Sequence, residues 1–509
     1  MVAMNEPLPE LPSLSLQEAP APAPAAPIQL KALIAPESLP VHPLPELSNL
    51  PESEADFTAL PEPDLQATPI PERQPLFVAQ PIPEPQLPQP SPTRFELPLA
   101  ASFVQAEPHQ EPAPLPVAAE TPAPRPAAQR LVSLDTYRGF IMLLMASGGL
   151  GIASLAKNQP GSVWAQIAPY LEQVAWIGCA PWDLIQPAFM FMVGVAMAFS
   201  LAKREAQGQG FAAQLFHAVV RSVVLVALGV LLSTTASSPQ TNWIFTNVLA
   251  QIGLGYVFLF LLSRYNNTSV VLSTIFLLIC YWLWFAVYPP PRPDFPLASI
   301  GATAQDVLPQ PFTPWSKHIN AAADLDRLLL NELPRKKLFA FNPGGYQTFN
   351  FIPAIATMAL GLLCGRLLRG PRSDWAKVGR LVLWGVLLTA AGWAAGEYVC
   401  PLVKRIWTPS WVLFSGGIVI LMLSAFYVAI EMLGLRKLAM PLAIVGMNSI
   451  FVYLGYQLCS GWIKATLQVH LGAQIFDGDF GPMIERGSVV AVLWLLCWWL
   501  YRRRAFLSI

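Results

Sequence analysis

Ten long apolar stretches alternate with short polar segments from about residue 136 to the C-terminal end of the chain. Each is close to the ~20 residues that a helix needs to cross a hydrocarbon core of ~30 Å. Apolar residues lie all round each helical wheel, which is typical of membrane spans rather than of surface helices. The pattern predicts an all-α, polytopic membrane domain over residues 131–509, with transmembrane helices near 136–156, 182–202, 212–233, 245–263, 269–288, 349–368, 379–396, 411–430, 439–459 and 486–501.

Residues 1–130 have a different pattern. This segment holds 31 of the 52 prolines, which remove backbone donors and cannot lie inside helices. It has few aromatic residues, so it could bury little apolar surface to offset the entropy of ordering. We expect a disordered, polyproline-II-rich tail that acts as a spacer or, alternatively, as a docking arm for a partner with a peptide-binding groove. Its first residues lack the basic and apolar regions of a signal peptide.

Charge separates the same two parts. Residues 1–130 carry 5 basic and 16 acidic side chains, a net charge of −11, and the remainder carries +11, so the formal net charge of zero is a cancellation. This composition excludes a single soluble domain, a collagen-like fibre and a basic nucleic-acid-binding protein.

Lysine and arginine also predict orientation, because they are enriched in cytoplasmic loops. With the tail in the cytoplasm, sixteen basic residues fall on the inner side and five in the short outer loops. We therefore expect a multi-pass protein of the cell (inner) membrane with both termini in the cytoplasm. The outer loop 289–348 is long and contains an amphipathic helix in "INAAADLDRLLLNEL".

Familiar motifs of soluble enzymes are missing. The sequence has no CxxC, HExxH, Walker or GxGxxG pattern, so it predicts no zinc, P-loop or dinucleotide site. Cys179 and Cys400 lie near outer span ends and are expected to be free thiols. Gly361 and Gly365 form a GxxxG pattern, which indicates close helix packing.

Polar residues at membrane depth are therefore the candidates for chemistry, because they are costly there and usually functional. One cluster, in "RLVSLDTYRGF", places Asp135 and Arg138 at the inner mouth of the first span. Three others lie at or within later spans and supply Trp176, Asp183 and Gln186, then Tyr346, Gln347 and Asn350, and finally Asn448 and Ser449.

Each cluster also has a purely structural interpretation. Asp135 and Arg138 are three residues apart and could be an ion pair that anchors a helix end. Asp183 could cap the second span at the positive end of its dipole. Asn448 could join two helices by a hydrogen bond.

Taken together, four motifs resemble those of the heparan-α-glucosaminide N-acetyltransferase family, within the wider transmembrane acyltransferase superfamily. They are "RLVSLDTYRGF", the run W-x-G-x-x-x-x-D-L-x-x-P-x-F-x-F-x-x-G that starts at Trp176, "GGYQTFNFIPAIATM" and "VGMNSIFVY", in the family's order. The first motif is the least specific, since the superfamily shares it. The resemblance covers about residues 131–501 and leaves out the tail.

This resemblance implies transfer of an acetyl group across a membrane, from cytosolic acetyl-CoA to an amine of a terminal glucosamine. The family's aspartate corresponds to Asp183. Its essential histidine, three residues before the tryptophan, corresponds to Gln173, and an amide cannot take up a proton as imidazole does. Asp183 could replace it as the base, as could His318 if the 289–348 loop covers the site.

The expected site follows from the resemblance. Asp183 and Gln173 would be catalytic, with Gln173 holding the acyl carbonyl. Arg138, beside Asp135, would bind the phosphates of acetyl-CoA, a co-substrate rather than a permanently bound cofactor. A sugar-like acceptor would meet Trp176, Tyr346, Gln347, Asn350 and Asn448.

A second hypothesis stays open. The chain could be a non-catalytic relative that binds or transports an amphiphile through the same tunnel, and Gln173 favours this alternative. We expect the lipid bilayer and a small acceptor as partners, no nucleic acid, and an assembly that could be homo-oligomeric.

Overall fold

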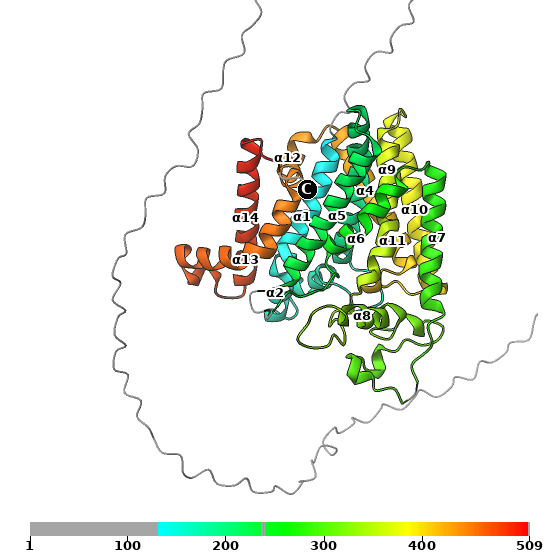
Figure 1. The fold of residues 1–509 in the computed structure, drawn as a ribbon. Helices are drawn as coiled ribbons and strands as arrows, with labels where there is room; N and C mark the ends of the chain where they lie inside the picture. Colours follow the sequence, from blue (N-terminus) through cyan, green and yellow to red (C-terminus); the bar gives the residue numbers. More distant parts are fainter. Residues whose placement is uncertain (1–130, 236–237, 239, 293, 507–509) are drawn as a thin grey trace, which may run out of the picture. The chain divides into compact units, whose positions relative to one another are not determined.

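The computed structural model describes residues 131–235, 238, 240–292 and 294–506, and the expected disordered tail at 1–130 lies outside them. Within these residues the fold is all-helical, as the apolar pattern predicts, and apart from two isolated β-bridges no strand forms. The helices, drawn in Figure 1, are α1 Val132–Ser147, α2 Ile152–Asn158, α3 Val163–Ile167, α4 Ile185–Ala206, α5 Phe211–Ser233, α6 Val248–Leu262, α7 Asn267–Ala286, α8 Ala321–Asn331, α9 Phe351–Arg369, α10 Asp374–Tyr398, α11 Pro409–Tyr427, α12 Arg436–Met447, α13 Ser449–Leu471 and α14 Gly481–Arg502.

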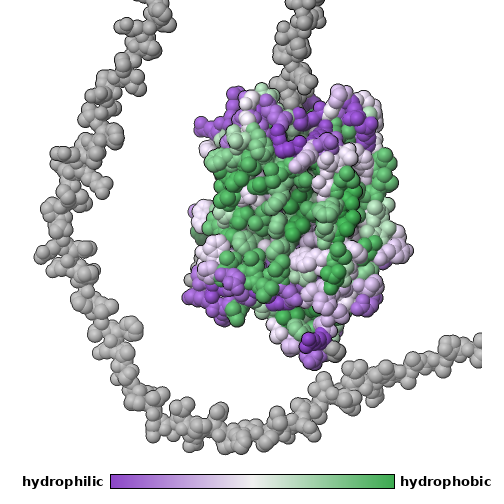
Figure 2. Space-filling view, turned by 45° about the vertical axis from the view of Figure 1, so that its right-hand side comes forward, coloured by the Kyte–Doolittle hydropathy of each residue, from purple (hydrophilic) through white to green (hydrophobic). Residues whose placement is uncertain are grey.

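Eight of the described helical segments are long and apolar enough to cross a membrane, and the bent pair α12–α13 makes a ninth candidate. Figure 2 shows the result as an apolar belt between two hydrophilic rims. The chain is therefore a multi-pass membrane protein. The fourth predicted span, 245–263, corresponds to α6, which has 15 residues and spans only about 22 Å.

Two predicted spans are not continuous helices. The first, 136–156, is interrupted at Gly148–Gly151, where three glycines and Leu150 have positive φ. The ninth, 439–459, breaks at Asn448, and α12 and α13 meet there at a bend of 64°. Asn448 has φ −123° and ψ 36°, outside the helical region, so one straight span over 439–459 is wrong.

Burial divides the helices into inner and outer ones. In the most apolar 18-residue stretch of each span, 72% of the residues are buried in α9 and 67% in α4. The buried share is only 17% in α14 and 22% in α5 and α10. The outer helices therefore turn apolar side chains to the lipid, and α4 and α9 form the centre.

Glycines allow α4 and α9 to touch along a seam formed by Gly194, Gly361 and Gly365. A Cβ atom on Gly194 would lie 1.8 Å from the carbonyl oxygen of Met358, and one on Gly361 would lie 2.0 Å from that of Phe191. The GxxxG pattern therefore marks a close helix contact, as predicted.

The helical region has two unlike ends. At one end α1, α7, α10 and α12 begin and α4, α9 and α14 finish, and we call it the arginine-rich end. Helix α12 lies at this end, at the top of Figure 1. The loop-rich end is the opposite one and carries α2, α3, α8 and the segments 159–184, 287–350 and 399–408. Helix α8 forms inside the predicted amphipathic segment, capped by the Asn320 side chain.

Candidate functional site

A cavity of about 460 Å³ opens at the loop-rich end, where three helices and four loops converge. Its walls come from α1, α4 and α13 and from the loops that precede α4, α6, η7 (Thr348–Asn350) and α11. It is lined by Met145, Gly148, Gln173, Trp182, Ile185, Gln186, Phe189, Thr246, Asn247, Val248, Tyr346, Lys404, Tyr453 and Gln457. The late start of α6 contributes to this space, because the chain reaches Val248 before it becomes helical.

Gln173 and Tyr346 are in direct contact in the cavity wall. The Tyr346 hydroxyl donates a hydrogen bond of 2.6 Å to Oε1 of Gln173. Burial raises the pKa of Tyr346, so the phenol keeps its proton and its donor role. Because Oε1 is engaged, the Nε2 hydrogens of Gln173 are the groups available to a ligand.

Asp183 and Lys404 form a buried ion pair beside the cavity. Nζ of Lys404 lies 3.2 Å from Oδ1 of Asp183, and their side chains are only 4% and 1% exposed. Oδ2 of Asp183 accepts backbone N–H bonds from Val174 and Ala180. Lys404 lines the cavity, whereas Asp183 lies behind it.

Two opposing effects act on the amine of Lys404. Burial lowers its pKa, because desolvation penalises the ammonium form, and the Asp183 carboxylate raises it. The lowering prevails, so this amine gives up its proton more readily than an exposed lysine does.

Arg405, the next residue, holds the rim of the cavity together. Its guanidinium donates to the carbonyl oxygens of Gly344 and Val174 and lies 5.5 Å from the centre of the Tyr346 ring. Trp407, fully buried with φ 49°, ends the turn before α11. The Lys404–Arg405 pair therefore fixes two loops that are far apart in the sequence.

The other predicted residues of this end support the loops. Trp176 donates from Nε1 to the carbonyl oxygen of Trp315, and its ring occupies the place a Cβ on Gly345 would need. Gln347 is buried and bonds Gly345, and Asn350 donates to the carbonyl oxygen of Arg405. None of these three side chains is among those that line the cavity.

His318 does not take the place of the missing imidazole. Its ring is buried against Phe341, with centroids 5.1 Å apart, and it is not among the residues that line the cavity. Burial lowers its pKa to about 4. The alternative in which His318 replaces the imidazole is therefore not supported by its position.

The remaining predicted residues lie at the arginine-rich end. Asp135 and Arg138 approach to 3.7 Å, with side chains 7% and 30% exposed. Asn448 is buried at the α12–α13 break and donates to the carbonyl oxygen of Ala505. Seven residues of α1, about 10 Å, separate Arg138 from Met145 in the cavity wall.

Sequence reasoning missed Lys404 and Arg405 as site residues and counted them only as outer-loop charges. A signal was present: "KRIW" is a basic pair directly before a span, on the side where basic residues are rare.

Comparison with known proteins gives a distant sequence relationship to the same kind of protein that the motifs resemble. The chain is 25% identical over 430 residues to the heparan-alpha-glucosaminide N-acetyltransferase of Mus musculus and 23% identical over 425 residues to that of Homo sapiens. These alignments cover 76% and 75% of this chain but 61% and 60% of the relatives, so the chain spans about three fifths of their length. No family model matches. The chain is thus a distant relative of a membrane N-acetyltransferase.

Proposed function

We propose that the protein is a membrane acyltransferase. It moves an acetyl or other short acyl group from acyl-CoA at the arginine-rich end to a sugar-like acceptor at the loop-rich end. The distant N-acetyltransferase relatives support the reaction class. The observation that carries the proposal is one cavity containing both an oriented amide, Gln173, and a buried amine, Lys404.

Acyl transfer to an amine needs two kinds of group. Attack of the acceptor nitrogen on the thioester carbon forms a C–N bond, places negative charge on the carbonyl oxygen and finally breaks the C–S bond. Donors must stabilise that oxygen, and a base must take the nitrogen's proton and deliver it to the leaving thiolate.

The cavity offers both. Gln173, held through Oε1 by Tyr346, presents its N–H groups to the carbonyl oxygen. We assign to Lys404, in the cavity wall beside Asp183, the role of proton acceptor in place of the family's imidazole, and burial shifts its pKa downward, the direction this role needs. Asp183 acts as the orienter, because its carboxylate oxygens already accept from Lys404 and two backbone N–H groups.

The donor reaches the cavity from the opposite end. Arg138 is partly exposed, at 30%, and lies 3.7 Å from Asp135, so its guanidinium would be within reach of a coenzyme A phosphate. The acyl-bearing arm would then follow α1 toward Met145, and the acceptor would enter between Tyr346 and Gln457.

The test is acetyl transfer by the purified full chain in lipid nanodiscs, with isotope-labelled acetyl-CoA and a panel of amino sugars. We expect a labelled N-acetyl product from at least one sugar with wild type, and none with Lys404→Met. Lys157→Met, which removes an exposed lysine of α2 at the same end, is the matched control and should leave the rate unchanged. Absence of both acetyl-CoA binding and transfer would overturn the proposal.

A second function is favoured by one observation, the amide at position 173. If Lys404 stays protonated in its ion pair with Asp183, the cavity has hydrogen-bond donors but no base. The protein would then bind an amphiphile without turning it over. Saturable binding of an acyl-CoA or acyl sugar without product would identify this function.

A further inference from the structure

A second cavity of about 630 Å³ lies on the lipid-facing side of α9, between α7 and α10, and we call it the α7–α10 groove. Its volume is in the ~300–1,000 Å³ range of ligand pockets. It is lined by Asn267, Thr268, Val271, Leu272, Leu360, Leu363, Cys364, Arg366, Leu367, Arg372, Arg380, Trp384, Leu387, Leu388 and Ile420. Most of these side chains are apolar, and the groove extends about 12 Å along α10 from Arg380 to Leu388.

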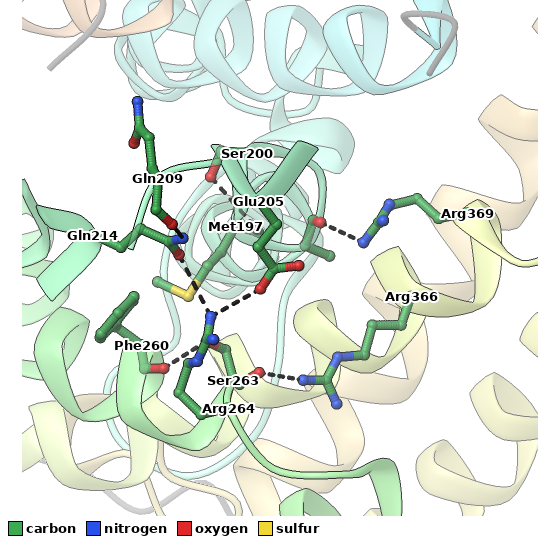
Figure 3. A network of polar contacts seen from close by, with 11 residues as sticks. Met197, Ser200, Glu205, Gln209, Gln214, Phe260, Ser263, Arg264, Arg366 and Arg369 are labelled. Carbon is green, nitrogen blue, oxygen red and sulfur yellow. Dashed lines mark hydrogen bonds and ion pairs between the residues drawn. The ribbon is translucent and has the colours of Figure 1, made fainter. Parts of the chain in front are cut away.

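Three arginines stand at the mouth of the groove, and they differ in how they are held. Arg366 is fixed in the network of Figure 3, where it donates to the carbonyl oxygen of Ser263, and it also donates to the Asn267 side chain. Arg372 and Arg380 are exposed, and within the described parts of the chain neither guanidinium makes a hydrogen bond or ion pair.

Nearby acidic groups do not cancel this positive charge. Asp374 is occupied, because it accepts from the Tyr427 hydroxyl at 2.7 Å and lies 3.6 Å from Lys377. Glu205 is paired with Arg264. The mouth thus keeps the charge of Arg372 and Arg380 free for a ligand.

Backbone dipoles add to the same field. Helices α7 and α10 both begin at this mouth, and the first N–H groups of a helix have no acceptor within it. Their positive ends favour an anion at the place where the arginines lie. An anionic head with an apolar extension of about 12 Å fits both parts of the groove.

We propose that the α7–α10 groove binds an anionic phospholipid from the leaflet at the arginine-rich end. The phosphate lies between Arg372 and Arg380, and one acyl chain follows Leu272, Leu387 and Leu388. A free phosphate or a nucleotide would leave the apolar length of the groove unused, which is why a lipid is the occupant. This inference does not depend on acyl transfer.

Lipid titration of the purified full chain, followed by native mass spectrometry, tests the proposal. Phosphatidylglycerol and phosphatidylcholine with the same acyl chains are compared, and we expect tighter binding of the anionic lipid. Arg372→Gln/Arg380→Gln should weaken phosphatidylglycerol binding roughly 30-fold, since each interfacial cation contributes about 1 kcal/mol and 1.4 kcal/mol is tenfold. Binding of phosphatidylcholine should not change.

Matched variants separate the groove from general surface charge. Arg503→Gln/Arg504→Gln removes two charges from the same end outside the groove and should change neither affinity. Leu272→Trp should weaken both lipids by filling the groove, whereas Leu283→Trp, on the same helix but outside it, should not.

Three results would overturn the inference: equal affinity of wild type for the two lipids, an unchanged affinity in the Arg372/Arg380 variant, or inorganic phosphate that binds as tightly as phosphatidylglycerol. The lipid-free melting temperature of each variant shows whether it is folded. Both arginines are exposed, so we expect no change in that temperature.

Discussion

The two ends of the helical region each hold a carboxylate–cation pair, and the pairs differ in burial. At the loop-rich end Asp183 and Lys404 lie 3.2 Å apart with side chains 1% and 4% exposed. At the arginine-rich end Asp135 and Arg138 lie 3.7 Å apart, and Arg138 is 30% exposed. In the first pair, Oδ2 of Asp183 also accepts two backbone N–H groups, whereas the second pair is the one to which we assigned a ligand in the proposed function.

This difference suggests a division of labour within one helical bundle. A buried pair is costly to break, so in the proposed reaction it would hold the geometry of the reacting groups. A partly exposed pair contributes little to stability, so it can serve as a reversible binding site.

The largest expected effect is in the accessibility of the two ends, because only one of them can face the cytoplasm. In a cysteine-free background, Ser373→Cys at the arginine-rich end should resist an impermeant thiol reagent in intact cells. Ser299→Cys in the loop 289–348 should react. Labelling at position 373 but not at 299 would invert the topology predicted from the basic residues.

Removal of one buried partner should have the largest energetic effect. Lys404→Met leaves the Asp183 carboxylate buried without a cation, and we expect a loss of about 3–5 kcal/mol in stability. Thermal unfolding in detergent measures it. Lys404→Met/Asp183→Asn should recover part of the loss, and a double variant as unstable as the single one would contradict the charge argument.

Position 173 tests the chemistry of the same end. If the second function holds and the wild-type cavity has no base, Gln173→His should raise acetyl transfer at neutral pH by roughly 10²-fold or more, because imidazole then supplies a general base. The rate should rise through a pKa near 6.5 as the imidazole becomes neutral. A lower rate than wild type would show that the amide itself is required, and Lys404 would remain the candidate base.

Asp326 in α8 extends the comparison to a buried carboxylate that lacks a buried cation. Burial raises its pKa from 3.8 to about 7, against the opposing hydrogen bond from the Thr348 N–H. The folded state therefore binds more protons than the unfolded state between these values, and stability should fall as pH rises from about 4 to about 7.

Asp326→Asn should remove that slope while keeping an oxygen for the Thr348 N–H. Unfolding temperatures of both proteins across this pH range measure the difference. Identical pH dependence in the two would mean that Asp326 is ionised throughout.

The exposed pair should give the smallest effect. Arg138→Ala should weaken coenzyme A binding about tenfold, as expected for loss of one charge-assisted hydrogen bond. Asp135→Asn should disturb folding more than binding. Equal coenzyme A affinity in wild type and Arg138→Ala would leave the pair as a helix anchor.

Sequence periodicity was enough for the helical class and for most helix positions, because a membrane span needs a long apolar run. It could not predict the break at Asn448, where an apolar run continues through a non-helical residue. It also overestimated α6, since the predicted span began at Phe245, three residues before the helix starts at Val248.

The site was only partly predictable for a related reason. Motif resemblance identified Gln173, Asp183 and Tyr346, which the fold brings to one cavity or its back wall. Lys404 is 221 residues from Asp183 in the chain, and no local spacing reports such a pairing. Asn350 and Gln347 looked like binding residues because they are polar at a span end, where loop carbonyls also need partners.

The glycine seam between α4 and α9 has a consequence for how this protein can change over time. At Gly194 and Gly361 even one added methyl group would overlap a backbone oxygen of the other helix. Neither oxygen can move aside without displacing a whole helix, so every substitution there is a large-effect one. Substitutions compatible with folding are therefore expected on the lipid-facing helices and in the loops, and not along this seam.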